Sequence, residues 1–165
     1  MGTDPTRIDI EIDPVRKRMA GISTHGYLHF DVSIMSQIDR NLWQGGCEDG
    51  LLLPPFIKHL VSLYPWESYT VEHELSSYLQ VVMYDSEDQE FDQMDAIAAW
   101  VQRCVDDAPT LVHCQAGLNR SSVVAARVLV LNGMSPSEAI DTIRTKRSPV
   151  CLCNPSFERW LRTTN

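Results

Sequence analysis

The sequence lacks the long apolar runs and the paired cysteines that mark membrane-spanning and secreted chains. No stretch approaches twenty uninterrupted apolar residues, which is about the length that a transmembrane helix needs. The first seven residues contain no apolar core of a signal peptide. The five cysteines are an odd number and form no even framework of the kind that small secreted domains use. We therefore expect a cytoplasmic protein with reduced thiols and no contact with a membrane.

Metal-binding patterns are also missing from the sequence. Cys151 and Cys153 are separated by a single residue, which is the wrong spacing for a zinc ribbon. No second pair of Cys or His residues completes such a site. We therefore expect the protein to work without a metal and without any other cofactor.

The charge of the chain is negative overall but unevenly distributed. The net charge is −8 at pH 7, so binding to bulk nucleic acid is disfavoured. Residues 111–165, however, contain seven Arg and Lys residues against three Asp and Glu residues. This distribution suits an anionic substrate group, bound by the C-terminal part of a protein that otherwise repels polyanions.

The length of 165 residues and the apolar content of 44% are typical of one globular domain with a substantial core. The sequence contains no internal repeat and no low-complexity tract. Residues 1–35 show little regular spacing apart from a short predicted strand at 27–30. We assign them to an N-terminal extension that packs on the domain or precedes it, and residues 36–165 to the domain itself.

Segments with the spacing of strands alternate with segments that have the spacing of helices. This alternation predicts an α/β fold, in which a central, mostly parallel sheet of four to five strands is flanked by helices on both faces. Residues 51–56 favour a short helix or a turn, because a pair of prolines interrupts them. The predicted strands are 38–43, 60–64, 79–84 and 110–112, and the predicted helices are 91–105, 123–131 and the segments that begin at Ser135 and Asn154.

Nine residues between a short apolar strand and a long apolar helix carry the clearest chemical signal. They run from His113 to Ser121 and read HCQAGLNRS. A loop that leads into a helix N-terminus presents backbone N–H groups and the positive end of the helix dipole, which together bind phosphate. In such a place the thiol of Cys114 is favoured as a nucleophilic thiolate, and the guanidinium of Arg120 can hold two phosphate oxygens. Gly117 permits a left-handed turn close to the anion.

Each of these residues taken alone has a simpler explanation. A buried Cys is usually a small core residue, an Arg at a helix start usually lies on the surface, and a His beside a Cys could be half of a metal site. Their combination between a strand and a helix favours the nucleophile, the anion cradle and the forked donor of a phosphate-ester hydrolase.

The pattern His-Cys-x5-Arg-Ser resembles the signature of the cysteine-dependent protein tyrosine phosphatases, and the short chain is similar to the dual-specificity group. The resemblance covers roughly residues 36–162, and it includes 38–46, which resembles the family's opening strand and Gly pair. It implies a phosphoprotein phosphatase that hydrolyses phosphotyrosine, with phosphoserine and phosphothreonine as further substrates, through a cysteinyl-phosphate. The resemblance implies that Cys114 is the nucleophile, that Arg120 binds the phosphoryl group and that Ser121 assists the departure of the thiolate. It also implies that His113 orients the loop. The phosphate-binding residues that it implies are Gln115, Ala116, Gly117, Leu118, Asn119 and Arg120.

Cleavage of a phosphate ester needs a proton for the leaving oxygen, and a carboxylic acid can supply it. Four carboxylates, Asp85, Glu87, Asp88 and Glu90, follow the third predicted strand. In the family the acid lies about six residues before the apolar residue that leads the next helix. That spacing points to Asp85, six residues before Phe91, and leaves Asp88 as the alternative.

Two residues near the C-terminus complete the expected site. Arg147 ends a cationic helix terminus that suits the helix dipole, and in the family an arginine near this place can meet a second phosphate or an acidic part of the substrate. Asn154 resembles the polar residue that braces the catalytic loop in the family. It also suits the N-cap of the last helix.

Other proteins that use a similar loop remain as alternatives. An RNA 5′-phosphatase or triphosphatase often has Asn before the Arg, as Asn119 is here, but Asp85 and the acidic composition argue against it. A phosphoinositide phosphatase tends to carry lysines in this loop, which contains none. A rhodanese-like sulfur carrier would not need Asp85, and phosphopeptide-binding relatives without activity usually lose the cysteine. The expected partner is therefore a phosphorylated protein.

Overall fold

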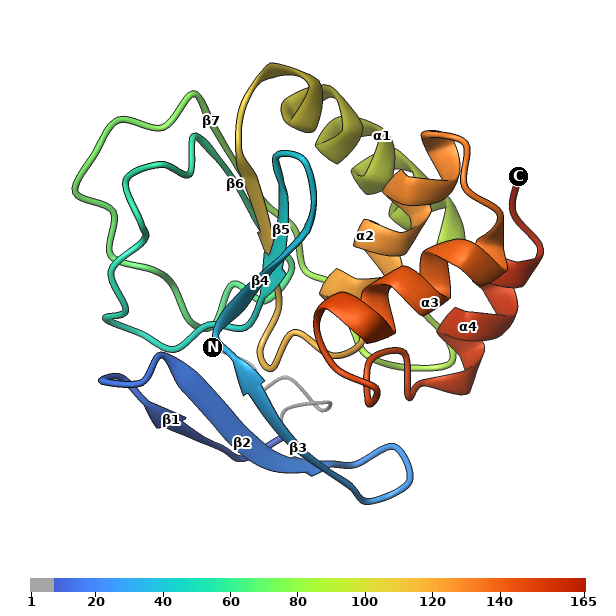
Figure 1. Cartoon of the computed structure of the whole chain (residues 1–165), viewed down its shortest axis with the longest axis horizontal. Helices are drawn as coiled ribbons and strands as arrows, with labels where there is room; N and C mark the ends of the chain where they lie inside the picture. Colours follow the sequence, from blue (N-terminus) through green and yellow to red (C-terminus); the bar gives the residue numbers. More distant parts are fainter. Residues whose placement is uncertain (1–7) are drawn as a thin grey trace.

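The computed structural model describes residues 8–165, in which four helices and two β-sheets pack together (Figure 1). The central sheet has five strands in the order β4-β5-β8-β6-β7. β4 pairs antiparallel with β5, and the other pairs are parallel. The predicted α/β fold with a mostly parallel sheet is thus confirmed. Its strands are β4 (Met35–Asp39), β5 (Leu42–Gly45), β6 (His59–Ser62), β7 (Ser77–Gln80) and β8 (Thr110–His113).

β8 lies at the centre of this sheet, between β5 and β6. All four of its residues are buried, which agrees with the apolar run in the sequence, because a strand in the middle of a parallel sheet is covered on both faces. The register places Gly45, His113 and Ser62 side by side at the carboxyl ends of the three strands. Since ligands bind outside this edge in open α/β sheets, the loop after His113 starts where a binding site is expected.

The four helices gather on one side of the central sheet (Figure 1). α2 is the innermost of them, because it contacts the other three helices together with β5 and β8. The predicted helical segments are confirmed, and Ser135 and Glu138 form the capping box expected at the start of α3. The helices are α1 (Phe91–Asp107), α2 (Arg120–Leu131), α3 (Pro136–Lys146) and α4 (Pro155–Arg162).

The opposite face differs from the expectation of helices on both faces. The connections 46–58 and 63–76 cover it, on the side of the sheet away from the helices (Figure 1). Pro54 and Pro55 interrupt the first connection and remove backbone donors that a helix would need. The segment that could have formed a short helix is therefore a turn.

Two strands differ from their predicted positions. The predicted strand at 38–43 is a hairpin in which β4 ends and β5 begins around Asn41. The backbone of Asn41 has a φ of 61°, a left-handed conformation that Asn adopts more readily than most residues. The residues between Ile38 and Leu42 are all polar, which suits a turn at this place. The strand expected at 79–84 lies at 77–80 instead, because β7 pairs with β6 only over this length.

Residues 10–33 form a second, antiparallel sheet where the sequence indicated one strand. Its strands are β1 (Ile10–Asp13), β2 (Arg18–Ser23) and β3 (Leu28–Ser33). Met19, Phe30 and Val32 of this N-terminal sheet are buried in the common apolar core. The N-terminal sheet therefore packs on the domain, near the carboxyl ends of the central strands (Figure 1).

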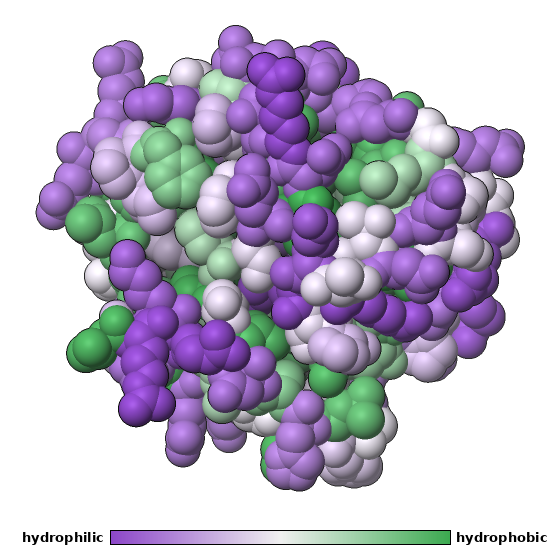
Figure 2. Space-filling view, in the orientation of Figure 1, coloured by the Kyte–Doolittle hydropathy of each residue, from purple (hydrophilic) through white to green (hydrophobic). Residues whose placement is uncertain are grey.

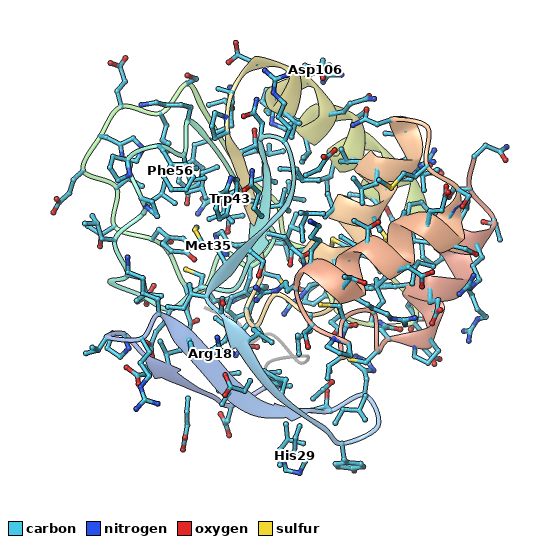
Figure 3. The ribbon with its side chains drawn as sticks, viewed as in Figure 1. Arg18, His29, Met35, Trp43, Phe56 and Asp106 are labelled. Atoms are coloured by element: carbon cyan, nitrogen blue, oxygen red, sulfur yellow. The ribbon has the colours of Figure 1, made fainter. Side chains whose placement is uncertain are left out.

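The face of the molecule seen in Figure 2 carries small apolar areas. Figure 2 shows polar side chains over much of the face in view, with apolar patches between them. On the side of the sheet away from the helices, the rings of Trp43 and Phe56 pack with their centroids 5.1 Å apart (Figure 3). Within residues 8–165, no helix combines the length and the apolar character needed to cross a membrane.

Candidate active site

The loop from Cys114 to Asn119 is anchored through its backbone carbonyl groups. All six carbonyl oxygens accept hydrogen bonds from the surrounding protein. The donors are His113 Nδ1 for Cys114, Cys47 N for Gln115, Arg147 Nη2 for Ala116, Gln44 Nε2 and Arg147 Nε for Gly117, Leu152 N for Leu118 and Val123 N for Asn119. Because a peptide's N–H points opposite to its carbonyl, this anchoring turns the amides the other way.

The amides of the loop face a small pocket at the N-terminus of α2. Within residues 8–165, the N–H groups of residues 115–119 have no hydrogen-bond acceptor. The lining of the pocket contains Cys114, Arg120 and Asp85, together with loop residues. Converging amides at a helix N-terminus form a site for an anion, as the sequence predicts.

Cys114 lines this pocket, and 2% of the residue is exposed. Its Sγ is 3.3 Å from the Ser121 hydroxyl. That hydroxyl is held in turn by the Gln44 amide, 3.3 Å away, and by the Gly45 carbonyl, 3.4 Å away. The expected pair of nucleophile and neighbouring hydroxyl is thus assembled by β5, β8 and the first turn of α2.

Arg120 is the first residue of α2, and only 3% of it is exposed. Its Nη1 donates to the Met83 carbonyl at 3.2 Å. The guanidinium also lies over the Tyr64 ring, 5.0 Å from its centroid, an arrangement that favours a cation. These contacts hold the charge of Arg120 at the same pocket as Cys114.

Asp85 is the carboxylate that the structure brings to the pocket. Oδ2 accepts from Asn119 Nδ2 at 2.9 Å and from His25 Nε2 at 3.0 Å, and Oδ1 accepts from Asn154 Nδ2 at 2.8 Å. Burial favours the neutral acid, but His25, Asn154 and Arg120 outweigh it, and the pKa of Asp85 lies below its ordinary value.

The other carboxylates of this connection lie outside the lining of the pocket. Glu87, Asp88 and Glu90 are exposed. The geometry therefore supports Asp85 over Asp88 as the candidate acid.

Asn154 contacts both the start of α4 and the loop that follows Cys114. Its Oδ1 accepts from Ser156 N at 3.0 Å and caps α4. Its backbone N donates to Asn119 Oδ1 at 2.9 Å, and its Nδ2 donates to Asp85. Asn154 thereby joins the catalytic loop to the connection that holds the candidate acid.

Arg147 lies beneath the loop rather than at the substrate side. Nε and Nη2 donate to the carbonyls of Gly117 and Ala116 at 2.7 and 3.0 Å, and Nη1 donates to the Ser33 carbonyl and the Ser36 hydroxyl at 2.9 and 3.1 Å. A guanidinium used in this way braces the loop. The expectation that Arg147 meets a second phosphate or an acidic substrate group therefore needs correction.

His113 is buried behind the loop, and its Nδ1 donates to the Cys114 carbonyl at 3.1 Å. The Tyr69 ring packs against it edge to face, with centroids 5.3 Å apart. Burial lowers the pKa of His113 to about 4, and the charge of Arg120 acts in the same direction. His113 is thus neutral at pH 7, so it orients the loop without adding a positive charge beside the thiol.

Sequence reasoning missed Gln44 and His25 as parts of the site. Gln44 is fully buried, and its Nε2 donates to the Gly117 carbonyl and to the hydroxyls of Ser121 and Ser122. A polar residue inside an apolar strand, directly before the Gly pair, was the available signal. His25 comes from a region with no readable pattern, so no local signal could have identified it.

A buried thiol, an inward-facing ring of amides and a fixed guanidinium at one pocket define a cysteine-dependent phosphatase. The family model for the dual specificity phosphatase catalytic domain matches residues 56–165. Since this match covers more than half of the chain, the protein belongs to the dual specificity phosphatase family. It is therefore a protein phosphatase, a hydrolase whose substrates carry phosphoryl groups, and the RNA and phosphoinositide alternatives are not favoured.

Solved structures with this fold agree with the family match. Human DUSP28 is 17% identical with a TM-score of 0.65, and the alignment covers 78% of this chain and 90% of that one. The human tyrosine phosphatase-like serine/threonine/tyrosine-interacting protein is 19% identical with a TM-score of 0.62, covering 78% and 93%. OH1 from the Orf virus, a tyrosine phosphatase, is 21% identical with a TM-score of 0.56, covering 77% and 83%. No curated protein sequence matched the chain.

We expect Gly117→Ala to reduce kcat/KM for an aryl phosphate by roughly a hundredfold, because displacement of a positioning group by about 1 Å has an effect of this size. Gly117 has a φ of 69°, and a Cβ there would lie 2.5 Å from Gly45 C and 2.6 Å from Arg147 Nη2. Gly50→Ala is the matched control, since Gly50 has a φ of 88° with open space around it. Equal activities of the two variants would contradict the prediction.

The burial of neutral His113 predicts a loss of stability in acid. The unfolded chain binds a proton near the ordinary pKa of 6.5, whereas the folded chain binds it only near pH 4. The free energy of unfolding contributed by this group is therefore complete above pH 6.5 and falls as the pH approaches 4, by on the order of 3 kcal/mol. Urea unfolding across this range should show a shallower pH dependence for His113→Gln, and identical slopes would refute the assignment.

Proposed function

We propose that the protein hydrolyses phosphotyrosine, together with phosphoserine and phosphothreonine, on protein substrates through a cysteinyl-phosphate intermediate. Cys114 is the nucleophile, Asp85 the general acid and base, and Arg120 the phosphoryl ligand. Ser121 assists the departure of the thiolate, and His113 positions the loop. The single observation that carries this proposal is the anchoring of the loop carbonyls, which leaves the amides of residues 115–119 to receive the phosphoryl oxygens.

In the first step the Cys114 thiolate attacks phosphorus in line with the leaving oxygen. The S–P bond forms as the P–O bond breaks, and Asp85 transfers its proton to the departing phenol or alcohol. Arg120 and the loop amides stabilise the negative charge on the three equatorial oxygens. The pocket supports this geometry because the thiol, the carboxyl and the guanidinium all line it.

In the second step water releases the phosphoryl group. The Asp85 carboxylate accepts a proton from the attacking water, the new P–O bond forms and the S–P bond breaks. Inorganic phosphate leaves, and Asp85 is again the protonated acid. The Ser121 hydroxyl, 3.3 Å from the sulfur, can donate a hydrogen bond to the thiolate as it departs.

We also propose that residues 36–165 form the catalytic domain and residues 1–35 its N-terminal extension. The family match within 56–165 supports the former, and the separate sheet formed by β1–β3 supports the latter. Residues 1–7 of that extension lie outside the described part of the chain. A cytoplasmic, reducing location is part of the proposal and is consistent with five free thiols.

The substrate class is tested by side-by-side turnover of four compounds: a phosphotyrosyl peptide, a phosphothreonyl peptide, a phosphoinositide and a triphosphorylated RNA. We expect the two peptides to be hydrolysed with higher kcat/KM than the other two. Faster turnover of the lipid or the RNA would replace the proposed substrate class.

Cys114→Ser should abolish turnover of an aryl phosphate while the fold is retained. The loss should exceed about a hundredfold in kcat, because covalent catalysis by this group is removed as a whole. Cys104→Ser is the matched control, since Cys104 lies on α1 near Ser77 and away from the pocket lining. A smaller loss, with an unchanged far-ultraviolet circular dichroism spectrum, would rule out Cys114 as the nucleophile.

Asp85→Asn should remove the fall in kcat/KM that occurs as the pH rises. A general acid must be protonated to act, so the wild-type rate falls as the acid ionises, and Asn cannot ionise. We expect a loss on the order of a hundredfold or more on the acidic side of the profile for a substrate with a poor leaving group. Asp88→Asn serves as the control. If kcat/KM no longer falls with rising pH in Asp88→Asn, and still falls in Asp85→Asn, the acid is Asp88.

A further inference from the structure

The N-terminal sheet forms part of the wall of the catalytic pocket. Ile8, Ser23 and Thr24 line the pocket together with Cys114. The Gln115 side chain of the catalytic loop binds the backbone of Ile8 at both ends, accepting from its N–H at 2.9 Å and donating to its carbonyl. Because Ser23 and Thr24 line the pocket, the connection from β2 to β3 lies close to the reacting groups. It lies outside the segment that matches the family model.

His25 extends from this connection to the candidate acid. Its backbone N–H donates to the Ser23 hydroxyl at 3.2 Å, and Gly26 and Tyr27 close the turn with φ values of 86° and 54°. Its Nε2 lies 3.0 Å from Asp85 Oδ2, and the two side chains are only 24% and 12% exposed. Through this contact a side chain of the N-terminal extension touches the candidate acid directly.

We propose that His25 is a positioning residue that holds Asp85 and sets the pH range in which Asp85 acts as the acid. The proposal rests on the function assigned to Asp85 above. The first step needs Asp85 protonated and the second needs it ionised. A neighbouring imidazolium stabilises the ionised form, so it favours the base of the second step and restricts the acid of the first to lower pH.

The other groups around Asp85 cannot give the same pH dependence. From the catalytic loop and α2, Asn119 and Arg120 face Asp85, and the guanidinium remains charged throughout the working range. From the start of α4 come the amide of Asn154 and, nearby, the thiol of Cys153, whose pKa burial raises. On the connection that carries Asp85 itself, Glu87 acts on His25. His25 is therefore the partner whose charge changes near neutral pH.

The charge on His25 depends on the carboxylate that it contacts. The hydrogen bond to Asp85 raises the pKa of His25, and the nearby Glu87 acts in the same direction. The ion pair is complete between the lowered pKa of Asp85 and the raised pKa of His25. At higher pH the imidazole becomes neutral and the pair loses its ionic part.

The activity test compares His25→Gln with the wild type and with His29→Gln. His29 is a matched control in the same sheet, and it points away from the domain (Figure 3). With phenyl phosphate, whose leaving group needs the proton, we expect the high-pH limb of kcat/KM to move to higher pH in His25→Gln. At a fixed pH on that limb, kcat/KM should rise roughly tenfold. His25→Lys keeps a cation beside Asp85, so the high-pH limb of kcat/KM should stay at its wild-type position.

A substrate with a good leaving group separates electrostatics from a general structural effect. With 4-nitrophenyl phosphate the rise should be much smaller, because that phenolate leaves with little help from an acid. The proposal is overturned if His25→Gln and the wild type have the same profile, or if both substrates change by the same factor at every pH.

A titration supplies a readout that does not depend on turnover. In Cys114→Ser protein, the His25 resonances followed by NMR should titrate at higher pH than in the Cys114→Ser/Asp85→Asn double variant, and equal midpoints would overturn the proposal. The outcomes also distinguish the role of Asp85 from that of His25. If Asp85→Asn flattens the rate profile and His25→Gln does not move it, only the role of His25 falls. If Asp85→Asn leaves the profile unchanged, Asp85 is not the acid, and the proposed role of His25 is refuted as well.

Discussion

The outward anchoring of six consecutive carbonyl groups is the constraint on which the site depends. Separate parts of the chain supply the donors: Gln44 from β5, Arg147 from the end of α3, and the backbone around residues 47 and 152. Because these elements hold the peptide planes from outside, the N–H groups converge inside without any charged side chain in the loop before Arg120. The anion site is thus built by the fold as a whole, and its polar groups need no rearrangement when a phosphoryl group arrives.

Burial gives each ionisable group at this site a defined state. His113 is desolvated and neutral at pH 7, whereas the pKa of Asp85 lies below its ordinary value despite burial, because His25, Asn154 and Arg120 favour its ionised form. Arg120 keeps its charge against the Tyr64 ring. The same low polarity that would penalise an unpaired charge strengthens each of these paired ones. An acidic chain can therefore maintain a local region that attracts a doubly charged phosphate ester.

The sequence predicted the features that depend on local signals. The strand–loop–helix order around Cys114, the start of α4 at Asn154 and the capping box of α3 follow from spacing and cap chemistry within a few residues. The features that it did not predict depend on contacts between distant segments. The hairpin at Asn41 depends on the pairing of β4 with β5, and the bracing role of Arg147 requires carbonyls thirty residues away in the chain. His25 could not be identified for the same reason, since its partner Asp85 lies in the connection that follows β7.

The close packing of Gly45, Gly117 and Arg147 has a consequence for how this sequence can drift over generations. The space beside Gly117 is occupied by the other two residues, so that a methyl group at 117 would collide both with the backbone at 45 and with the guanidinium. The atoms of residue 45 that it would meet belong to the backbone, so no exchange at 45 can make room for a side chain at 117. Lineages of this protein should therefore keep glycine at 117.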